Sequence, residues 1–384
     1  WEQRKLGEIA VFSKGVGYSK NDLCEEGTPI ILYGRLYTKY ETCVFDVDTF
    51  VKEKAGSVYS KGGEVIVPAS GETAEDISIA SVVVKPGILL GGDLNIVSPT
   101  AEYDSAFLAL TISSGATHKY LSSLAQGKSV VHLHNSDIQS VSAKFPTKRE
   151  QEKIHLIFGK IDTLITLHQR KYEKLVNIKK SMLDKMFPKN GASVPEIRFK
   201  GFTDLWEQRK LGEVFEEYSE KNHAELPPLT IIQGGGTIRR DESERALQYD
   251  KSSLSNYKMV NKDDFIVHLR SFEGGLEKAS SQGIISPAYH TFHGEDVDSR
   301  FYYAYFRSKN FINKDLKPHV YGIRDGRSID IEGMKTIRIP WASYPEQKSI
   351  GDFLTHLDTL ITLHQRKLEK LQNIKKSCLE KMFV

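Results

Sequence analysis

Two internal repeats constrain the fold of this 384-residue chain more than any other feature. The octapeptide WEQRKLGE occurs at Trp1–Glu8 and again, without a change, at Trp206–Glu213. The segment Ile161–Phe187 returns as Leu357–Phe383, with about 22 identities in 27 positions. Repeats of this length indicate that one structural plan has been used twice.

The two copies are alike only at their ends. The first repeat recurs after 205 residues and the second after 196, so the copies differ by a net insertion of about nine residues. The sequences between the repeated ends, roughly 12–145 and 214–339, are not recognisably similar. A function for this chain must explain why the ends are kept while the middles diverge.

Each copy ends in a segment that is typical of a long helix. Thr147–Glu150 and Ser343–Glu346 both match the S/T-x-x-E capping box that begins many helices. Apolar residues then recur at helical spacing, and no proline interrupts the first segment before Pro188. A helix of about 40 residues extends roughly 60 Å and must bury its apolar stripe on a partner. The other copy is the expected partner, in an antiparallel, coiled-coil-like pair.

We therefore predict an α+β fold with a pseudo-twofold internal repeat. Two mixed α/β heads, head 1 (1–146) and head 2 (206–342), would be separated by two long antiparallel helices (147–187 and 343–384), with a linker at 188–205. Alternating apolar residues predict strands, and two further segments predict short helices. The predicted strands are 65–70, 77–84, 95–99, 264–270, 284–292 and 336–340, and the short helices are 104–114 and 299–308.

Composition excludes several classes of protein. The hydrophobic fraction of 39% and the charged fraction of 27% are those of a globular protein, and no apolar run is long enough to span a membrane. Three cysteines without a C-x-x-C pair indicate reduced thiols and a cytoplasmic location. The two long helical segments are basic and the remainder is slightly acidic. Any binding of nucleic acid by the heads must therefore come from local groups.

No catalytic motif is visible. The sequence Gly127-Lys128-Ser129 lacks the first glycine of a phosphate-binding loop, and Gly234–Gly236 is expected to be a flexible loop. His132 and His134 share a strand face and could bind a metal, but no third ligand is apparent nearby. We expect neither a metal site nor a cofactor in this chain.

The repeated ends carry a resemblance to a known family. WEQRKLGE, the linker sequence VPEIRFKGF, the Glu-Gln pair at the start of each long helix and the repeated IDTLITLHQRK…KMF segment resemble the specificity subunit of bacterial type I restriction–modification enzymes. One departure is that no VPEIRFKGF-type segment precedes Trp1, which suggests a chain that begins earlier or has been trimmed.

The resemblance implies a non-catalytic subunit that recognises double-stranded DNA. Each head would be a target recognition domain that reads one half of an asymmetric, bipartite site, and the helices would fix the spacer. Two methylation subunits would dock on the helices, and restriction subunits would join through them. S-adenosylmethionine, ATP and magnesium are expected on these partner subunits. The alternative is a non-catalytic coiled-coil scaffold whose heads bind proteins.

Candidate DNA-binding residues follow from chemistry and position alone. Base recognition uses Arg, Lys, Asn, Gln and Ser at strand ends and in loops. The candidates in head 1 are Lys14, Tyr18, Arg35, Tyr37, Ser70, Lys128, His132 and His134. Those in head 2 are Arg239, Arg240, Arg270, Ser271, Arg324 and Arg327.

Overall fold

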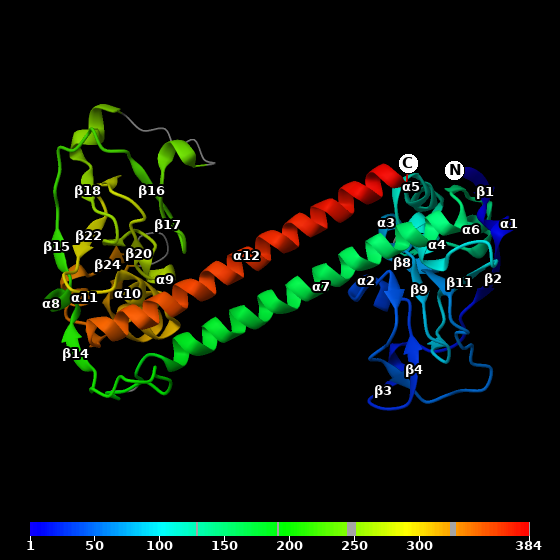
Figure 1. Ribbon diagram of the computed structural model, residues 1–384, viewed down its shortest axis with the longest axis horizontal. Coiled ribbons are helices and arrows are strands. Elements are labelled where there is room, and N and C mark those ends of the chain that lie inside the picture. The colour runs from blue at the N-terminus through cyan, green and yellow to red at the C-terminus, as the bar shows by residue number, and fades with distance from the viewer. Residues whose placement is uncertain (128–129, 190–191, 244–250, 323–327, 384) are drawn as a thin grey trace. The chain divides into compact units, whose positions relative to one another are not determined.

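The computed structural model describes residues 1–127, 130–189, 192–243, 251–322 and 328–383. The chain forms two compact units, and each combines one head with parts of both long helices. The first unit comprises Trp1–Arg170 and Gln365–Val384, and the second comprises Lys171–His364 (Figure 1). The boundary between the two units therefore lies within the long helices.

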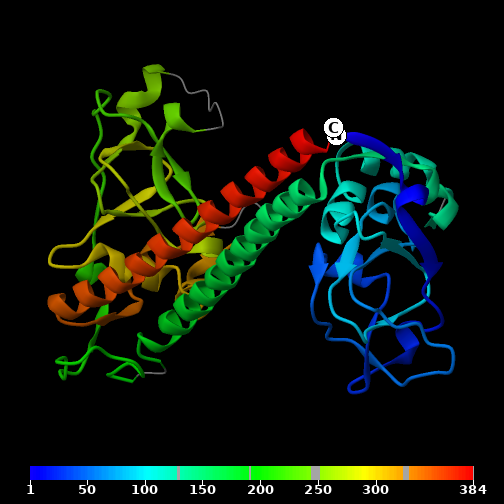
Figure 2. The ribbon, with the colours of Figure 1, turned by 45° about the vertical axis from the view of Figure 1, so that its right-hand side comes forward.

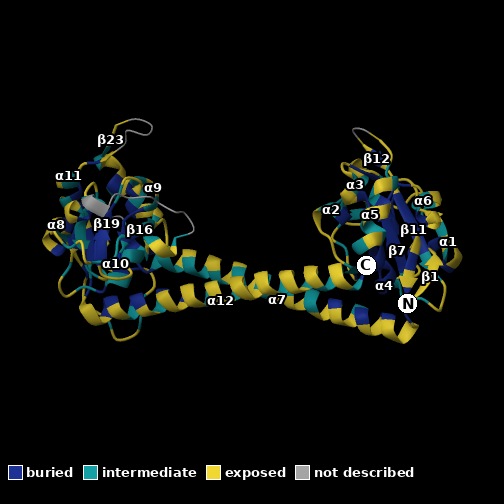
Figure 3. Ribbon diagram, turned by 90° about the horizontal axis from the view of Figure 1, so that it is seen from above, coloured by how far each residue is buried: buried dark blue, intermediate teal, exposed yellow. Residues whose placement is uncertain are grey.

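Helices occupy both of the repeated segments in which they were predicted. α7 spans Lys148–Lys185 and α12 spans Tyr344–Met382. Within the first unit the two run antiparallel, because Phe158 lies beside Phe383 and Asp162 pairs with Lys375 one turn further on. Buried positions gather where each helix leaves its head, and the remainder of each helix alternates between exposed and half-buried residues (Figure 3).

The first unit is built on a five-stranded sheet with the order β2-β11-β7-β9-β5. Its apolar core lies between this sheet and α4. The sheet strands are β2 (Ala10–Lys14), β11 (Leu94–Pro99), β7 (Glu64–Pro68), β9 (Ser81–Val83) and β5 (Cys43–Val44). A second sheet, β10-β4-β6-β3, contains β10 (Leu89–Leu90), β4 (Thr28–Ile31), β6 (Phe50–Val51) and β3 (Leu23–Cys24). The helices are α1 (Leu6–Ile9), α2 (Arg35–Thr38), α3 (Ala74–Ile77), α4 (Ser105–Ile112), α5 (Gly115–Leu124), α6 (Asn135–Ser140) and the 3-10 turn η1 (Lys20–Asp22).

The second unit has a four-stranded sheet with the order β15-β22-β19-β20. These strands are β15 (Glu216–Tyr218), β22 (His290–His293), β19 (Phe265–Val267) and β20 (Glu277–Lys278). Two-stranded pairs are formed by β16 (Leu229–Ile232) with β17 (Gly236–Arg239), β18 (Lys258–Val260) with β21 (Gly283–Ile285), and β23 (Val320–Tyr321) with β24 (Ser328–Ile329). The helices are α8 (Leu211–Val214), α9 (Ser271–Gly274), α10 (Ser299–Phe306), α11 (Ile331–Lys335), the π-helix η4 (Phe311–Leu316) and the 3-10 turns η2 (Arg240–Glu242), η3 (Lys251–Asn256) and η5 (Lys317–His319).

The two heads share one core plan despite their unrelated sequences. In sheet order, β2, β11, β7 and β9 of head 1 correspond to β15, β22, β19 and β20 of head 2. The helices α4 and α10 correspond as well, since an aspartate caps the N-terminus of each, Asp104 and Asp298. A sheet core requires only alternating apolar residues, so its order is kept while the identities change.

The repeated ends meet in each unit. β1 (Glu2–Lys5) pairs antiparallel with β13 (Ser142–Phe145), the strand that leads into α7 (Figure 2). β14 (Glu207–Lys210) pairs in the same way with β25 (Arg338–Trp341), which leads into α12. The two conserved ends of each copy are therefore one structural element, which closes the head and begins its long helix.

The glutamates in the first turns of the long helices do not have the partners that the predicted capping boxes would give them. The carboxylates of Glu150 and Glu346 accept hydrogen bonds from the indoles of Trp1 (3.2 Å) and Trp206 (3.0 Å). The neighbouring glutamines join helix to head. The Gln151 side chain accepts from Asp104 N at 2.9 Å, and that of Gln347 accepts from Asp298 N at 3.0 Å. Repeated residues thus fix how each head is attached to its helix.

Candidate nucleic-acid interface

The strand before the last small helix of head 1 presents two histidines on one exposed face. β12 (Val131–His132) and the residues after it alternate, with His132 and His134 exposed and Val131 and Leu133 buried. The two imidazole rings are parallel, with an interplanar angle of 3° and centroids 6.5 Å apart. The predicted shared face is confirmed. Among the described residues no group of three or more metal-binding side chains is found.

A buried polar network holds this histidine ledge, which we define as His132 and His134. Asn95 is fully buried on β11, and its Nδ2 donates to the carbonyl of Leu133 at 2.7 Å. Ser70 Oγ lies 3.1 Å from His132 Nδ1, and Tyr37 donates its hydroxyl to the carbonyl of Ser70 at 2.6 Å. Burial raises the pKa of Tyr37 above its usual value, so this hydroxyl remains a donor. Ser70 and Tyr37 therefore support the ledge.

Lys14 lies near the ledge at the exposed end of β2. Asn135, the first residue of α6, donates its side-chain amide to the carbonyl of Ser13 at 2.9 Å. This bond ties the end of β2 to the segment that carries His134. Lys14, His132 and His134 are therefore the predicted residues of head 1 that the described structure gathers on one exposed surface.

Two other candidates of head 1 have structural roles. The side chain of Arg35 is 7% exposed, and its guanidinium pairs with Asp48 at 2.6 Å and Glu41 at 2.9 Å. Its charge is already neutralised within the head, so the expectation that Arg35 contacts DNA is wrong for this conformation. Tyr18 accepts a hydrogen bond from Lys54 N at 2.7 Å and thereby anchors a loop of the second sheet. Arginine was a reasonable candidate by type, but burial decides its role.

In head 2 the loop after the central strand β19 exposes Arg270. The Arg270 side chain is exposed and forms no ion pair or hydrogen bond with the described residues, and its backbone N donates to His268 Nδ1 at 3.3 Å. Ser271 is fully buried, and its Oγ accepts from His268 N at 2.9 Å. Ser271 therefore closes the loop and is not a base-reading residue, contrary to prediction. Burial, with Arg307 and Arg270 nearby, lowers the pKa of His268 to about 4.

The glycine run of head 2 is not the loose loop that its composition suggested. Gly234 N and Gly236 N donate to the two carboxylate oxygens of Glu277, at 2.6 Å and 3.2 Å. Glu277 is fully buried, and it also pairs with Arg307 and accepts the Tyr303 hydroxyl at 2.8 Å. The turn between β16 and β17 is thus held from beneath by a charged group.

Arg239 is the last residue of β17 and Arg240 follows it, and both side chains contact other groups of head 2. Arg239 is exposed and forms a bidentate pair with Asp241, with distances of 3.1 Å and 2.8 Å. The Arg240 guanidinium lies over the Tyr257 ring, 5.2 Å from its centroid. Of the remaining candidates, Lys128, Arg324 and Arg327 lie outside the described residues. The flanking strand β24 lies beside α9, near Arg270.

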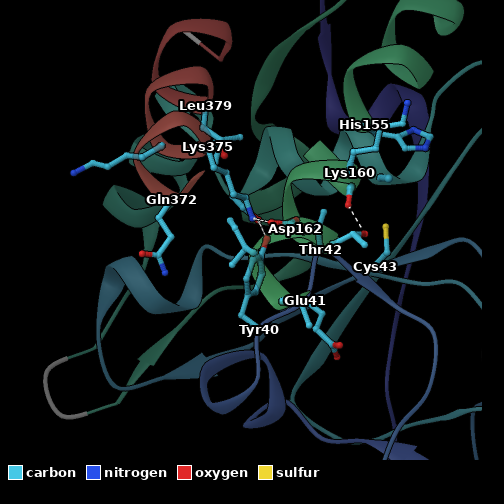
Figure 4. Close-up of a pocket in the computed structure, with 18 of the residues that line it drawn as sticks. Tyr40, Glu41, Thr42, Cys43, His155, Lys160, Asp162, Gln372, Lys375 and Leu379 are labelled. Atoms are coloured by element: carbon cyan, nitrogen blue, oxygen red, sulfur yellow. Dashed lines mark hydrogen bonds and ion pairs between the residues drawn. The ribbon is translucent and has the colours of Figure 1, made fainter. Parts of the chain in front are cut away.

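Below head 1 the helices leave an apolar groove of about 1820 Å³, within the first unit (Figure 4). Asp162 of α7 organises one wall, because it pairs with Lys375 of α12 at 2.5 Å and accepts from Thr42 of head 1 at 3.4 Å. Burial raises the pKa of the lining Cys43 thiol to about 11, so this thiol is protonated at neutral pH. Much of the remainder is lined by apolar side chains of the long helices and of the residue directly after α12: Leu156, Leu164, Leu167, Leu379 and Phe383.

Several of these apolar helix residues are exposed. Leu156, Leu164 and Leu167 retain 54%, 42% and 45% of their accessible surface. A cluster of exposed leucines on a long helix is typical of a surface that a partner covers. No helix in the described part of the chain is long and apolar enough to cross a membrane.

Comparisons with known proteins agree with the repeat. A family model described as the type I restriction modification DNA specificity domain matches residues 1–177 and 203–373, once in each copy. The type I restriction enzyme MjaVIII specificity subunit of Methanocaldococcus jannaschii is 23% identical and covers 98% of this chain and 90% of its own length. The putative MjaX specificity subunit of the same organism is 24% identical over 76% of this chain and 71% of its own length.

A solved structure has a similar fold. The S subunit of a type I restriction–modification system from M. genitalium aligns with a TM-score of 0.62 at 14% identity, over 100% of this chain and 96% of that one. The family model covers most of the chain, in two matches that follow the internal repeat. The chain belongs to the family of type I restriction–modification DNA specificity proteins.

Proposed function

We propose that each head of this specificity subunit reads one half of an asymmetric, bipartite DNA site. One observation carries the proposal. Two heads with the same strand order and the same attachment to their helices present different chemistry on their exposed loops. Head 1 offers two parallel imidazole rings with Lys14 nearby, and head 2 offers the guanidinium of Arg270. Groups that differ in this way pair with different base edges.

The conserved scaffold fits a requirement for fixed geometry. DNA half-sites read by linked modules lie about one helical turn apart, roughly 10 bp between centres. We propose that the long helices set this separation and hence the number of unspecified base pairs. Support comes from α7 and α12, helices of 38 and 39 residues that are tied to the heads by buried glutamines.

We further propose that two methylation subunits dock on the helices and that restriction subunits join through them. The groove below head 1 and its exposed leucines support such docking, since the fully buried core of a protein interface is more apolar than the rest of the surface. S-adenosylmethionine, ATP and magnesium would be held by these partners, in the cytoplasm. This chain would contribute DNA recognition and the arrangement of the complex.

The test is sequence-specific methylation. The chain, purified with methylation subunits, is expected to bind a target duplex much more tightly than random duplex and to direct methylation to one bipartite sequence. Sequencing the methylated bases of cells that carry the complex would identify both halves and the spacer. Binding to proteins without any DNA preference would instead support the scaffold alternative.

The first mutational prediction concerns Arg270. Arg270→Ala should relax recognition of one half-site only, by roughly 1–3 kcal/mol if the guanidinium is bidentate to a guanine. Competition binding with each half-site varied in turn measures this. Arg35→Ala is no suitable control because that side chain is buried, whereas His132→Ala should affect the opposite half. An equal loss on all sequences would identify Arg270 as a phosphate contact.

A second prediction concerns the groove. Leu164→Glu with Leu167→Glu should leave the thermal unfolding midpoint nearly unchanged, because both side chains are already substantially exposed. Affinity for a methylation subunit should fall by tenfold or more, since covering one leucine contributes about 1.5–3 kcal/mol. Isothermal titration or co-purification measures the loss. Val11→Glu, at a residue 70% exposed in head 1, is the control. Full retention of binding by the double variant would exclude this groove.

A further inference from the structure

The glycine turn of head 2 is part of the same surface as Arg270. Gln233 and Gly234 are exposed at the end of the β16–β17 hairpin. A Cβ atom added to Gly274 of α9 would lie 2.4 Å from Gln233 Nε2, so Gln233 rests directly on the helix that Arg270 caps. One surface therefore carries a cation and, beside it, a neutral amide.

This turn is built to hold one conformation. Gly234 and Gly236 have φ values of +82° and +76°, which only glycine adopts at no steric cost. A Cβ atom on Gly236 would lie 2.6 Å from Ser280 Oγ, so the backbone also approaches its neighbour closely. The Glu277 carboxylate packs against the turn and has four partners, namely the backbone amides of Gly234 and Gly236, the Tyr303 hydroxyl and the Arg307 guanidinium. Because a fully satisfied buried polar network is rigid, this carboxylate holds the turn in one conformation.

The hydrogen bonds exclude one role for the turn. A glycine-rich loop can bind phosphate through free backbone amides. Here the amides of Gly234 and Gly236 are bound to Glu277, and that of Gly235 donates to the carbonyl of Ile232 at 2.9 Å. The turn therefore presents no amide nest to an anion. The turn exposes the Gln233 side chain, and the residues that follow it are glycines, which have no side chain.

We propose that Gln233 is a base-reading residue of head 2 and that Glu277 is its positioning residue. Glutamine pairs with adenine through N6 and N7 in the major groove, and glycines beside it let the backbone approach DNA closely. Glu277 contacts no DNA; it holds the turn so that Gln233 and Arg270 face the same half-site. This inference rests on the proposed DNA recognition by head 2.

The experiment measures binding of the complex with its methylation subunits to duplexes with single base-pair changes. Gln233→Ala should weaken the cognate site by roughly tenfold and remove discrimination at one position of one half-site. Glu277→Gln should give a similar loss at the same position. Affinity for random DNA and its salt dependence should stay the same, because no phosphate contact is removed. Gln282→Ala, at another exposed glutamine of head 2, should have no effect.

The double variant Gln233→Ala with Glu277→Gln distinguishes positioning from a general structural role. If Glu277 acts through Gln233, the double variant binds no more weakly than Glu277→Gln alone. Additive losses would overturn the positioning role. Unchanged discrimination by Gln233→Ala, a surface substitution that does not depend on Glu277, would overturn the whole inference. Failure of the proposed function is separate, because the unaltered complex would then show no sequence preference.

Discussion

Arg198→Ala should lower the free energy of unfolding of the second unit by about 3–5 kcal/mol. Arg198 holds Glu346 in a bidentate pair, with Nε–Oε1 and Nη2–Oε2 distances of 2.7 Å and 2.8 Å. The carboxylate is 1% exposed, so removal of the guanidinium leaves a buried charge with the Trp206 indole as its remaining side-chain donor. Urea denaturation followed by tryptophan fluorescence measures the loss. In thermal unfolding, the midpoint temperature should fall by roughly 10 °C.

The repeat provides a matched control. Glu150 is the counterpart of Glu346 in the first unit, but it is exposed, and its side-chain donor among the described residues is the Trp1 indole at 3.2 Å. Glu150→Ala should therefore cost less than about 1 kcal/mol. The double variant Arg198→Ala with Glu346→Ala should be less destabilised than the sum of the single variants, because no unpaired charge remains. A small effect of Arg198→Ala alone would mean that water replaces the guanidinium.

The ends of each copy were predictable from sequence because they are local and repeated. Apolar spacing indicated the helices, and α7 begins at Lys148 close to the predicted position. The assignment of the first-turn glutamates failed because their partners, Trp1 and Trp206, lie more than a hundred residues away along the chain. Several strands were missed because segments such as β3 and β10 contain two residues, too few for an alternating pattern.

The candidate site was predictable only by residue type. The alternation of His132 and His134 is a local pattern, and it correctly indicated a shared face. Arg35 and Arg270 are chemically equal in the sequence, but Asp48 and Glu41 neutralise the first, whereas the second is exposed. Glu277 could not be found, because a lone glutamate in a strand shows no sign of burial until the turn above it is placed.

The arrangement of the two long helices allows their lengthening to be designed. Asp162 pairs with Lys375 in the first unit, and the Lys179 ammonium pairs with Asp358 in the second, at 2.5 Å in each case. The residue numbers of both pairs add to the same value, so each unit pairs its own helix segments with the same antiparallel offset. The sequence LHQR, at 167–170 and 363–366, lies between the two pairs in each helix.

Duplication of LHQR in both helices should lengthen the spacer of the DNA target and leave its specified bases unchanged. Four added residues extend a helix by about 6 Å, which equals one to two base pairs at 3.4 Å per base pair. Neither ion pair is disturbed, because each lies wholly on one side of the insertion. Sequencing of methylated DNA from cells that carry the variant complex measures the spacer directly.

Duplication in α7 alone is the informative control. One register cannot then satisfy both ion pairs and both apolar stripes, so we expect lower stability and weaker methylation without a new, defined spacer. If the double duplication changed the specified bases while the spacer kept its length, the helices would not be the measuring element. Because the insertions lie far from His132 and Arg270 in the sequence, a change of spacer with unchanged bases would separate the two tasks, recognition by the heads and measurement by the helices.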